Sequence, residues 1–380
     1  MSQVAGQPEG MKKGMQRTLY VRPVGIYPVR QDQDELWGGF RLAGLDLAFS
    51  ALEVIERGPR DKVSRRIVGL GEFMERDWGR HTLTASDLIE RIMGPRPRLA
   101  GLDLSTPSIM GIVNVTPDSF SDGGCHATTL DAVDHAMRLV DEGADILDIG
   151  GESTRPGSDA VPLDEELRRV MPVLERLRGK TDALISVDTR KAEVMRRAAA
   201  AGADILNDVS ALTHDPAALE TAAETGLSVM LMHAQGDPKT MNDNPQYTDV
   251  ALDVFDFLER RVQACEAAGI SNAKIVVDPG IGFGKHLHHN VAVLSTMSLY
   301  HGLGVPVLLG ASRKKLIGQL CNVESAAERV PGSIAAALSS IAQGVQIVRV
   351  HDVAATRQAV SVWQAAIMGS EAAAQPRTTL

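Results

Sequence analysis

Polar residues end most of the short apolar runs between residues 108 and 352, and they fall into two chemical groups. Carboxylates and amides form one group, which suits the N–H donor edge of a flat heterocycle such as an aminopyrimidine. Cations form the other group, which suits a phosphorylated substituent. The first group is Asp188, Asn207 and Asp278, and the second is Arg155, Lys314, Arg349 and His351. The residues therefore indicate a ligand that is neutral and rich in donors at one end and phosphorylated at the other.

Each of these residues has a structural alternative when it is considered alone. Asp188 or Asp208 could cap the helix that follows it, and Arg349 could form a structural or solvated ion pair. Packing alone does not easily explain why so many apolar runs end in polar groups. We therefore treat these residues as one candidate site.

The apolar runs alternate with Ala- and Leu-rich segments of helical period, which predicts repeated β-α units. Their nearly continuous apolar character is typical of parallel strands that are covered on both faces. The expected strands are 108–115, 144–151, 184–189, 205–210, 228–234, 274–280, 306–312 and 346–352. Eight units over about 260 residues predict an α/β protein with a closed (β/α)8 TIM barrel, whose site lies at the C-terminal ends of the strands. A doubly wound open sheet is the alternative, which the lack of Gly-x-Gly-x-x-Gly after the first strand disfavours.

The first hundred residues do not follow this period. We expect a strand over 19–29, a helix over 47–57, and a second helix that Thr84 or Ser86 caps and that ends near residue 94. The turn-forming residues 94–97 mark a boundary. The chain then divides into an N-terminal extension of α+β structure and unknown function, residues 1–100, and the barrel, residues 101–380. The extension could be an appendage that packs on the barrel, or a surface for self-association or a partner.

The composition argues against several classes of protein. The 380 residues hold 39 Lys and Arg against 48 Asp and Glu, a net charge of −9, with 7 Phe, 4 Tyr and 3 Trp and no basic block. Nucleic-acid surfaces rely on positive charge and stacking aromatic residues, so we expect no nucleic-acid partner. Cys125, Cys265 and Cys321 lack metal-site spacing, which indicates a reduced, cytoplasmic protein. We expect neither export nor a membrane span, because no long apolar stretch occurs.

Longer motifs in the same regions identify a family. They are GIVNVTPDSFSDGG at 111–124, DIGGESTRPG at 148–157, SVDT at 186–189, LND at 206–208, DPGIGFGK at 278–285, ASRK at 311–314 and RVHD at 349–352. Over residues 105–365, in order and spacing, the chain resembles the dihydropteroate synthases. The resemblance does not cover the first hundred residues.

This resemblance implies that 6-hydroxymethyl-7,8-dihydropterin pyrophosphate condenses with p-aminobenzoate to give 7,8-dihydropteroate and pyrophosphate, with Mg²⁺, in folate synthesis. It also implies a homodimer and a target of sulfonamides. By similarity, the pterin is held by Asp188, Asn207, Asp278 and Lys314. The Mg²⁺–pyrophosphate is bound by Asn114, which is also the metal ligand, and the pyrophosphate by Thr154, Arg349 and His351. The p-aminobenzoate is bound by Phe120, Thr154, Pro156 and Lys315. The catalytic group is Asp118, Asp122, Arg155 and Lys314, and the loops 116–125 and 154–159 close over the reaction.

The expected mechanism places catalysis on the leaving group. An arylamine is already a neutral nucleophile, so it needs no strong base, and the sequence shows no Ser/His/Asp or Cys/His motif. Stabilising the charge that develops on departing pyrophosphate favours a dissociative, SN1-like order. Two alternatives remain open: a pterin-binding domain of a corrinoid-dependent methyltransferase, and a non-catalytic pterin-binding relative. The first would lack the 116–124 loop and the Ser-Arg-Lys element, and the second would have lost a cation or a loop residue.

Three other features have ambiguous or structural interpretations. The glycine-rich segment 280–285 departs from the Walker pattern at Pro279 and His286, so we do not expect a nucleotide site. The histidines at 286, 288 and 289 have no matching carboxylate or cysteine spacing and indicate a solvated loop or a helix start. His233 could pack or cap, or form a wall of the pterin pocket. Lys315 could orient the carboxylate of p-aminobenzoate or face solvent at a helix start.

Overall fold

The computed structural model describes residues 18–29, 38–115, 125–153, 158–236, 240, 241 and 243–370, with the side chains of 125–128 excepted. Its larger part is a ring of eight parallel strands, in the order β10-β9-β8-β7-β6-β5-β12-β11. A bridge between Val277 and Val307 joins the two ends, and Val277 N donates to Pro306 O at 3.0 Å. The predicted (β/α)8 barrel is therefore confirmed. The strands are β5 (Ser108–Asn114), β6 (Ile146–Gly150), β7 (Leu184–Asp188), β8 (Ile205–Asp208), β9 (Ser228–Met232), β10 (Ile275–Asp278), β11 (Leu308–Leu309) and β12 (Ile347–Val350).

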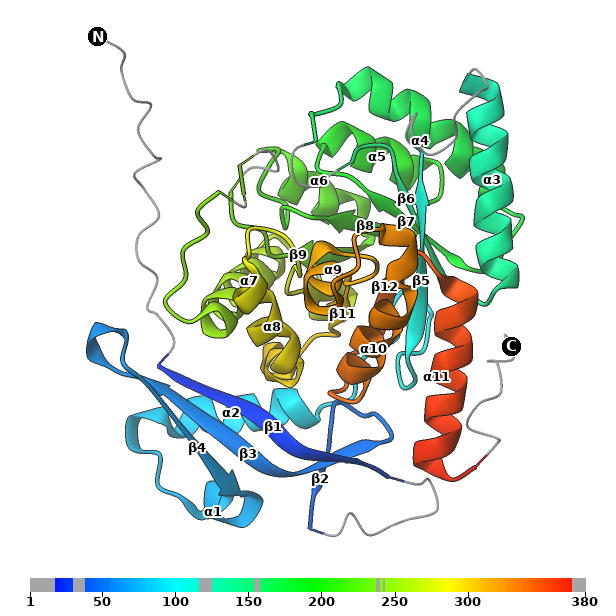
Figure 1. Cartoon of the computed structure of the whole chain (residues 1–380). Coiled ribbons are helices and arrows are strands. Elements are labelled where there is room, and N and C mark those ends of the chain that lie inside the picture. The colour runs from blue at the N-terminus through cyan, green and yellow to red at the C-terminus, as the bar shows by residue number, and fades with distance from the viewer. Residues whose placement is uncertain are drawn as a thin grey trace.

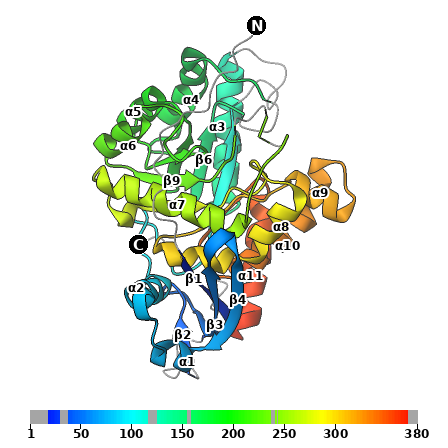
Figure 2. The same cartoon turned by 90° about the vertical axis from the view of Figure 1, so that its left-hand side faces the viewer.

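Helices surround this ring and alternate with its strands (Figures 1 and 2). They are α3 (Cys125–Asp141), α4 (Leu163–Leu177), α5 (Ala192–Ala200), α6 (Ala218–Thr225), α7 (Val250–Ala267), α8 (Leu287–Ser295), α9 (Lys315–Cys321), α10 (Val330–Ile341) and α11 (Val353–Met368), with the 3-10 turns η4 (Asn272–Lys274), η5 (Met297–Leu303) and η6 (Ala326–Arg329). In α4, Val170, Val173 and Leu177 follow helical spacing and are buried, which gives one face to the barrel. Within the described residues, no helix has the length and apolar character needed to cross a membrane.

The N-terminal end of the barrel is filled by a small core of its own. Leu99 and Leu102 exchange backbone hydrogen bonds of 2.9 and 2.8 Å, and this tight turn places Leu99 and Leu104 beside inward-facing strand residues. Those residues are Met110, Ile146, Ile205, Met230, Val276, Leu308 and Ile347. Because this end is packed with apolar side chains, the polar strand residues can gather only at the other end.

The extension forms a second, antiparallel sheet in which β3 pairs with β1 on one side and with β2 and β4 on the other. Its elements are β1 (Leu19–Pro28), β2 (Phe40–Arg41), β3 (Leu47–Arg57), η1 (Pro59–Asp61), β4 (Val63–Gly69), α1 (Leu70–Glu75), η2 (Gly79–His81) and α2 (Thr82–Met93). The strand predicted over 19–29 is confirmed as β1. The helix predicted over 47–57 is wrong, because these residues form the central strand β3. Their good helix formers are overridden by pairing with neighbours on both sides and by burial.

The second helix predicted for the extension is confirmed as α2, but its start is different. It begins at Thr82, its N-cap is His81, and no side chain caps it, so neither Thr84 nor Ser86 has the predicted role. The chain enters α2 directly from the η2 turn, in which Thr82 Oγ1 donates to Gly79 O at 2.8 Å. The helix ends at Met93 with Gly94 as its C-cap, close to the expected end near residue 94.

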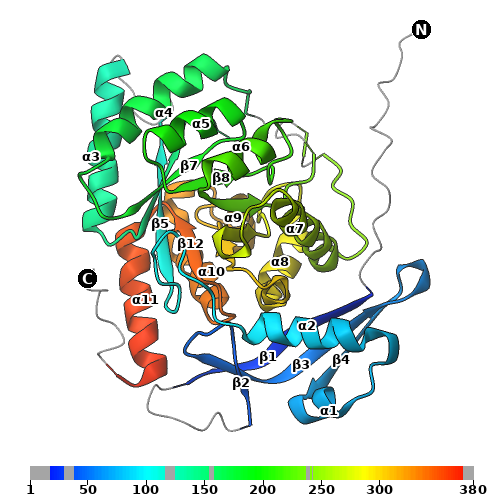
Figure 3. The same cartoon turned by 180° about the vertical axis from the view of Figure 1, so that it is seen from behind.

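The extension packs against α7 and η5 of the barrel (Figures 1 and 3). Tyr20 Oη donates to Asp256 Oδ1 at 2.8 Å, and Arg57 donates to Asp256 Oδ2 at 2.8 Å and to Asp253 Oδ1 at 2.9 Å. The Tyr20 ring meets Phe255 edge to face at 5.5 Å between centroids. One continuous core therefore includes both parts of the chain, so the extension is packed on the barrel.

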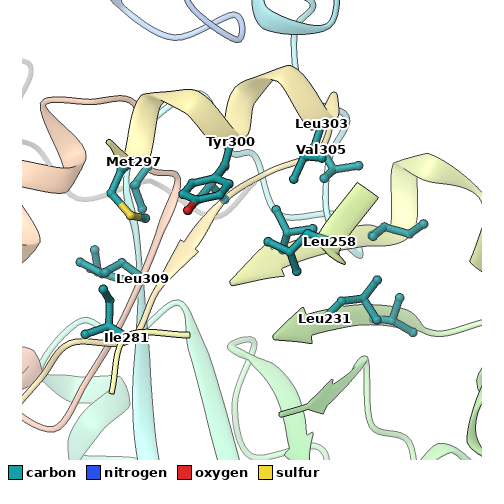
Figure 4. Packing of buried hydrophobic residues seen from close by; sticks show 14 of the residues in the cluster. Leu231, Leu258, Ile281, Met297, Tyr300, Leu303, Val305 and Leu309 are labelled. Atoms are coloured by element: carbon teal, nitrogen blue, oxygen red, sulfur yellow. The ribbon is translucent and has the colours of Figure 1, made fainter. Parts of the chain in front are cut away.

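Apolar side chains from η5, α7 and the strands meet beneath this contact. Figure 4 shows Met297 and Tyr300 of η5 pointing toward the barrel, near Leu309 of β11, while Leu258 of α7 lies near Leu231 of β9. All five side chains are buried. This packing joins η5 and α7 to the strands of the barrel.

Candidate active site

A buried ion-pair network joins four strands of the barrel near their C-terminal ends. Arg349 of β12 donates from Nε to Asp148 Oδ2 at 2.6 Å and from Nη2 to Asp188 Oδ2 at 3.0 Å. Asp148 also accepts from Asn207 Nδ2 at 3.1 Å and from Ser186 Oγ at 2.7 Å. Because Asp148 accepts three hydrogen bonds inside the ring, it anchors both the cation and the amide of the predicted site.

Burial changes the protonation of the central carboxyl. Desolvation and the neighbouring Asp148 raise the pKa of Asp188 to about 7, and Arg349 opposes this rise. Burial also opposes the charge of Arg349, but Asp148 and Asp188 outweigh it and raise the pKa of Arg349. The guanidinium therefore stays charged, while Asp188 changes its protonation near neutral pH.

A second carboxylate and a lysine face each other across β10 and β11. A Cβ built on Gly310 would lie 3.6 Å from Asp278 Oδ2 and 3.8 Å from Lys314 Nζ, so glycine leaves this space open. Lys314 Nζ lies 4.6 Å from the centroid of the Phe283 ring and donates to Ile281 O. Burial lowers the pKa of Lys314 to about 8 and raises that of Asp278, and each charge opposes the other's shift.

The loops after β11 and β12 are tied to each other. His351 Nδ1 and N each lie 3.1 Å from Ser312 Oγ, and Arg313 forms a two-pronged ion pair with Asp352 that includes a bond of 2.9 Å. The backbone of Arg313 is left-handed, with φ of 56°. These contacts hold His351 and Lys314 on adjoining loops, where this fold usually binds phosphate.

The structure brings together most of the predicted site residues that it describes. Asp188, Asn207 and Arg349 share one network, and Asp278 faces Lys314. Asn114 is half-buried at the end of β5 and pairs with Gly150, whose other neighbour in the ring is Asp188. The predicted residues that lie outside the described part of the chain are Asp118, Phe120, Asp122, Thr154, Arg155 and Pro156.

Lys315 and Asp208 do not take part in the contacts that join the other described site residues. Lys315 is exposed at the first position of α9. Asp208 accepts from the backbone N of Ser210 at 2.7 Å and of Leu212 at 3.0 Å. It does not cap the helix that follows, because α6 begins at Ala218 and no side chain caps it, so the helix-cap alternative for Asp208 is wrong. Asp208 therefore shapes the loop after β8.

The sequence reasoning assigned no role to Asp148 or Lys285, although both lie in the quoted motifs. Each carries a signal that could have been used. Asp148 interrupts an apolar strand of five buried residues, where a charge needs a partner. Lys285 ends the glycine-rich segment that follows a predicted strand, which is its signal in the sequence, and the structure shows that it is only 4% exposed.

The histidines have packing and capping contacts. His233 is buried, its ring meets Phe257 edge to face at 4.9 Å, and its Nδ1 lies 2.9 Å from Lys285 Nζ. These are the contacts of a packed residue. His286 and His289 form a capping box at the start of α8, and their rings stack at 5.6 Å, which supports the helix-start interpretation.

Comparisons with known proteins agree with this geometry. A family profile described as pterin binding enzyme matches residues 110–351. The dihydropteroate synthase of Escherichia coli K12 is 50% identical over 270 residues, which are 71% of this chain and 95% of that protein. Among solved structures, the Xanthomonas albilineans dihydropteroate synthase with 4-aminobenzoic acid is 53% identical with a TM-score of 0.68, and covers 71% of this chain and 98% of its own. The Yersinia pestis enzyme in a sulfonamide complex is 50% identical with a TM-score of 0.66, with 70% and 96% covered. The chain belongs to the pterin binding enzymes and, within them, to the dihydropteroate synthase family.

Proposed function

We infer that the protein is a dihydropteroate synthase, a transferase that joins 6-hydroxymethyl-7,8-dihydropterin pyrophosphate to p-aminobenzoate and releases pyrophosphate. One observation carries this conclusion: acceptors for a donor-rich heterocycle and cations for a phosphate converge at one end of the barrel. The chain is 50% identical to the dihydropteroate synthase of Escherichia coli over 270 residues, and the reaction of such an enzyme fits this site. The relative from Xanthomonas albilineans that holds 4-aminobenzoic acid supports the second substrate.

The pterin is proposed to bind between the two carboxylates. Asp188 Oδ2 is engaged by Arg349, and Oδ1 has no hydrogen bond within the described residues, so it can accept from the pterin N–H groups. Asp278 Oδ1 accepts from Gly280 N at 2.7 Å, and Oδ2 faces the space left by Gly310. Asn207 and Lys314 complete the set with an amide and an ammonium. These groups match the alternating donors and acceptors of a pterin edge.

The pyrophosphate is proposed to lie toward the loops after β11 and β12, near Arg349, His351 and the predicted Thr154. Arg349 uses Nε and Nη2 for Asp148 and Asp188, and its Nη1 makes no hydrogen bond within the described residues. Nη1 can therefore donate to a phosphate oxygen without breaking the network. Because the guanidinium is already anchored on two carboxylates, it need not reorganise as charge develops on the leaving group.

We also propose Mg²⁺, with Asn114 as the protein ligand. Mg²⁺ commonly keeps several waters and is held by one or two protein groups together with substrate phosphates. A single amide oxygen at the end of β5 fits that pattern, and the described residues hold no cluster of three His, Cys, Asp or Glu that would form an all-protein site. When bound, the ion would neutralise part of the negative charge of the pyrophosphate.

The proposed order is dissociative, with pyrophosphate leaving before the arylamine attacks. Ionised Asp188 and Asp278 stabilise positive charge on the pterin, and Arg349 and His351 stabilise negative charge on the pyrophosphate. The neutral arylamine then needs orientation more than activation. Asp118, Asp122 and Arg155 are proposed to act in closing loops with Phe120 and Pro156, which lie against p-aminobenzoate, and Lys315 is proposed to attract its carboxylate.

The deciding experiment measures pyrophosphate release by the full-length protein given the dihydropterin pyrophosphate and Mg²⁺, with and without p-aminobenzoate. We expect release that yields dihydropteroate and depends on p-aminobenzoate. Pterin binding without release would favour the non-catalytic alternative. Omission of Mg²⁺ should abolish the release, and full activity in a chelator would contradict the metal assignment.

We further propose that the protein acts as a cytoplasmic homodimer and is a target of sulfonamides. Family resemblance supports the dimer, and the Yersinia pestis relative in a sulfonamide complex supports the inhibitor class. The division into residues 1–100 and 101–380 is proposed on the same basis. Sedimentation velocity tests the dimer, and competition between a sulfonamide and p-aminobenzoate tests the inhibitor.

A further inference from the structure

Lys285 places a buried ammonium group behind the candidate pterin pocket. Its Nζ lies 2.9 Å from Gly280 O, 3.1 Å from Phe283 O and 2.9 Å from His233 Nδ1, with His233 O farther away at 3.5 Å. The residue is 4% exposed. Burial lowers the pKa of Lys285, and the nearby Asp278 carboxylate opposes this shift. The three close acceptors match the three N–H donors of an ammonium, so hydrogen bonds within the protein satisfy its charged form.

These three acceptors belong to two different strand ends. His233 follows β9, whereas Gly280 and Phe283 lie in the turn after β10. Gly280 has φ of +71°, and a Cβ there would come within 1.9 Å of His233 O, so the turn passes directly over the chain that follows β9. Lys285 therefore joins two adjacent segments by hydrogen bonds. Without it, carbonyl oxygens of the two segments would lie close together with no donor between them.

The same turn is held from outside by two further bonds. Gly282 N donates to Asn290 Oδ1 at 2.6 Å, and Tyr247 Oη donates to Gly284 O at 2.7 Å. Asn290 Nδ2 donates in return to Lys285 O at 3.0 Å. Lys285 is thus the inner support of a turn whose outer side is also fixed.

The supported turn carries groups of the candidate site. Asp278 lies at its start, Ile281 O accepts from Lys314 Nζ, and the Phe283 ring lies 4.6 Å from that same Nζ. A shift of the turn would therefore move both groups that contact Lys314 Nζ, the Ile281 carbonyl and the Phe283 ring. It would also change the electrostatic effect of Lys285 on Asp278, since this nearby lysine lowers the pKa of Asp278 against the larger effect of burial.

We propose that Lys285 is a positioning residue for pterin binding: it holds the 280–284 turn so that Asp278 and Lys314 face the ligand in a fixed geometry. This inference rests on the proposed function, because it assigns the pocket to a pterin. Lys285 contacts no ligand itself, since all three of its N–H groups are used by the protein. His233 serves the same purpose by accepting at Nδ1, which leaves its proton on Nε2.

The test replaces Lys285 by methionine, which keeps the length of the side chain and removes its charge and donors. We expect Lys285→Met to weaken the binding of 6-hydroxymethyl-7,8-dihydropterin by at least about tenfold, the effect of one lost hydrogen-bonded contact. Binding is measured by calorimetry on the folded full-length protein, together with kcat and the melting temperature. The phosphate-free ligand is used so that pterin contacts are read without turnover.

Lys274→Met is the matched control. Lys274 lies just before β10, at the opposite end of that strand, and its Nζ also donates to a glycine carbonyl, that of Gly226. It is exposed and far along the strand from the turn. We expect this variant to retain the dihydropterin affinity of the wild type.

Two outcomes separate this inference from the proposed function. Wild-type protein that binds dihydropterin but releases no pyrophosphate would refute the enzyme while leaving the role of Lys285 testable by affinity. A folded Lys285→Met variant with wild-type dihydropterin affinity would overturn the positioning role, even if its melting temperature fell. If that variant does not fold, Lys285→Gln, which keeps an N–H donor, takes its place, and failure of both to fold would assign Lys285 to folding alone.

A nuclear magnetic resonance measurement gives a second readout. Burial and the adjacent Lys285 hold the pKa of His233 well below its ordinary value. In Lys285→Met the Nδ1 donor and the nearby charge are gone, so the His233 ring should protonate at higher pH and its ¹⁵Nδ1 signal should shift. An unchanged ¹⁵Nδ1 signal would contradict the contact on which the proposal depends.

Discussion

Pterin affinity should depend on pH through Asp188, and this dependence tests the electrostatics of the site. In the free protein, burial and Asp148 raise the pKa of Asp188 to about 7. A bound donor edge favours the ionised carboxylate, so binding lowers this pKa and releases a proton below neutral pH. Affinity should therefore rise as the pH increases through 7 and level off above it.

The size of the effect follows from this pKa. With a free-state pKa of about 7 and a much lower pKa in the complex, only the ionised fraction binds. That fraction is roughly one tenth at pH 6 and about nine tenths at pH 8. The dissociation constant of the dihydropterin should accordingly fall about tenfold between pH 6 and pH 8, which corresponds to about 1.4 kcal/mol.

The assay is calorimetric titration with phosphate-free dihydropterin at pH 6, 7 and 8, for the wild type and for Asp188→Asn. The variant keeps the shape of the side chain but does not titrate, so its weaker binding should lack this pH dependence. Buffers of different ionisation enthalpy would count the released proton directly. A wild-type dissociation constant that is flat from pH 6 to pH 8, or an equal slope in Asp188→Asn, would refute the reasoning.

Three further substitutions test separate parts of the structure. Arg349→Ala should lower turnover more than it weakens phosphate-free pterin binding, and equal losses would contradict its place near the leaving group. Arg57→Met should reduce the free energy of unfolding by about 3–5 kcal/mol, because it leaves the buried Asp256 without its ion-pair partner and with only Tyr20 Oη of these two donors, whereas the exposed Arg66→Met control should change it by less than about 1 kcal/mol in urea titrations. Gly280→Ala should lower both melting temperature and dihydropterin affinity, because its Cβ would overlap a backbone carbonyl, and a variant with wild-type values would show that the turn can adapt.

Local patterns in the sequence determined much of the barrel and of the site. Nearly continuous apolar runs separated by helical periods predict parallel strands, because such strands are buried on both faces. The C-terminal ends of these strands meet at one end of a barrel, so the sequence alone groups Asp188, Asn207 and Asp278. Strand limits were less exact: the run predicted at 306–312 contains only β11 (Leu308–Leu309), since Pro306 lacks an N–H donor and Gly310 weakens a strand.

Only the tertiary structure decided which partners these residues have. Asp148 and Arg349 are 201 positions apart, and no local pattern shows that one carboxylate anchors the guanidinium, the Asn207 amide and the Ser186 hydroxyl. The same holds for β3. Its sequence is rich in helix formers, but it forms a central strand because it pairs with β1 and β4. Periodicity reports which faces are buried, whereas ion pairs and sheet neighbours depend on contacts between distant segments, which exist only once the chain has folded.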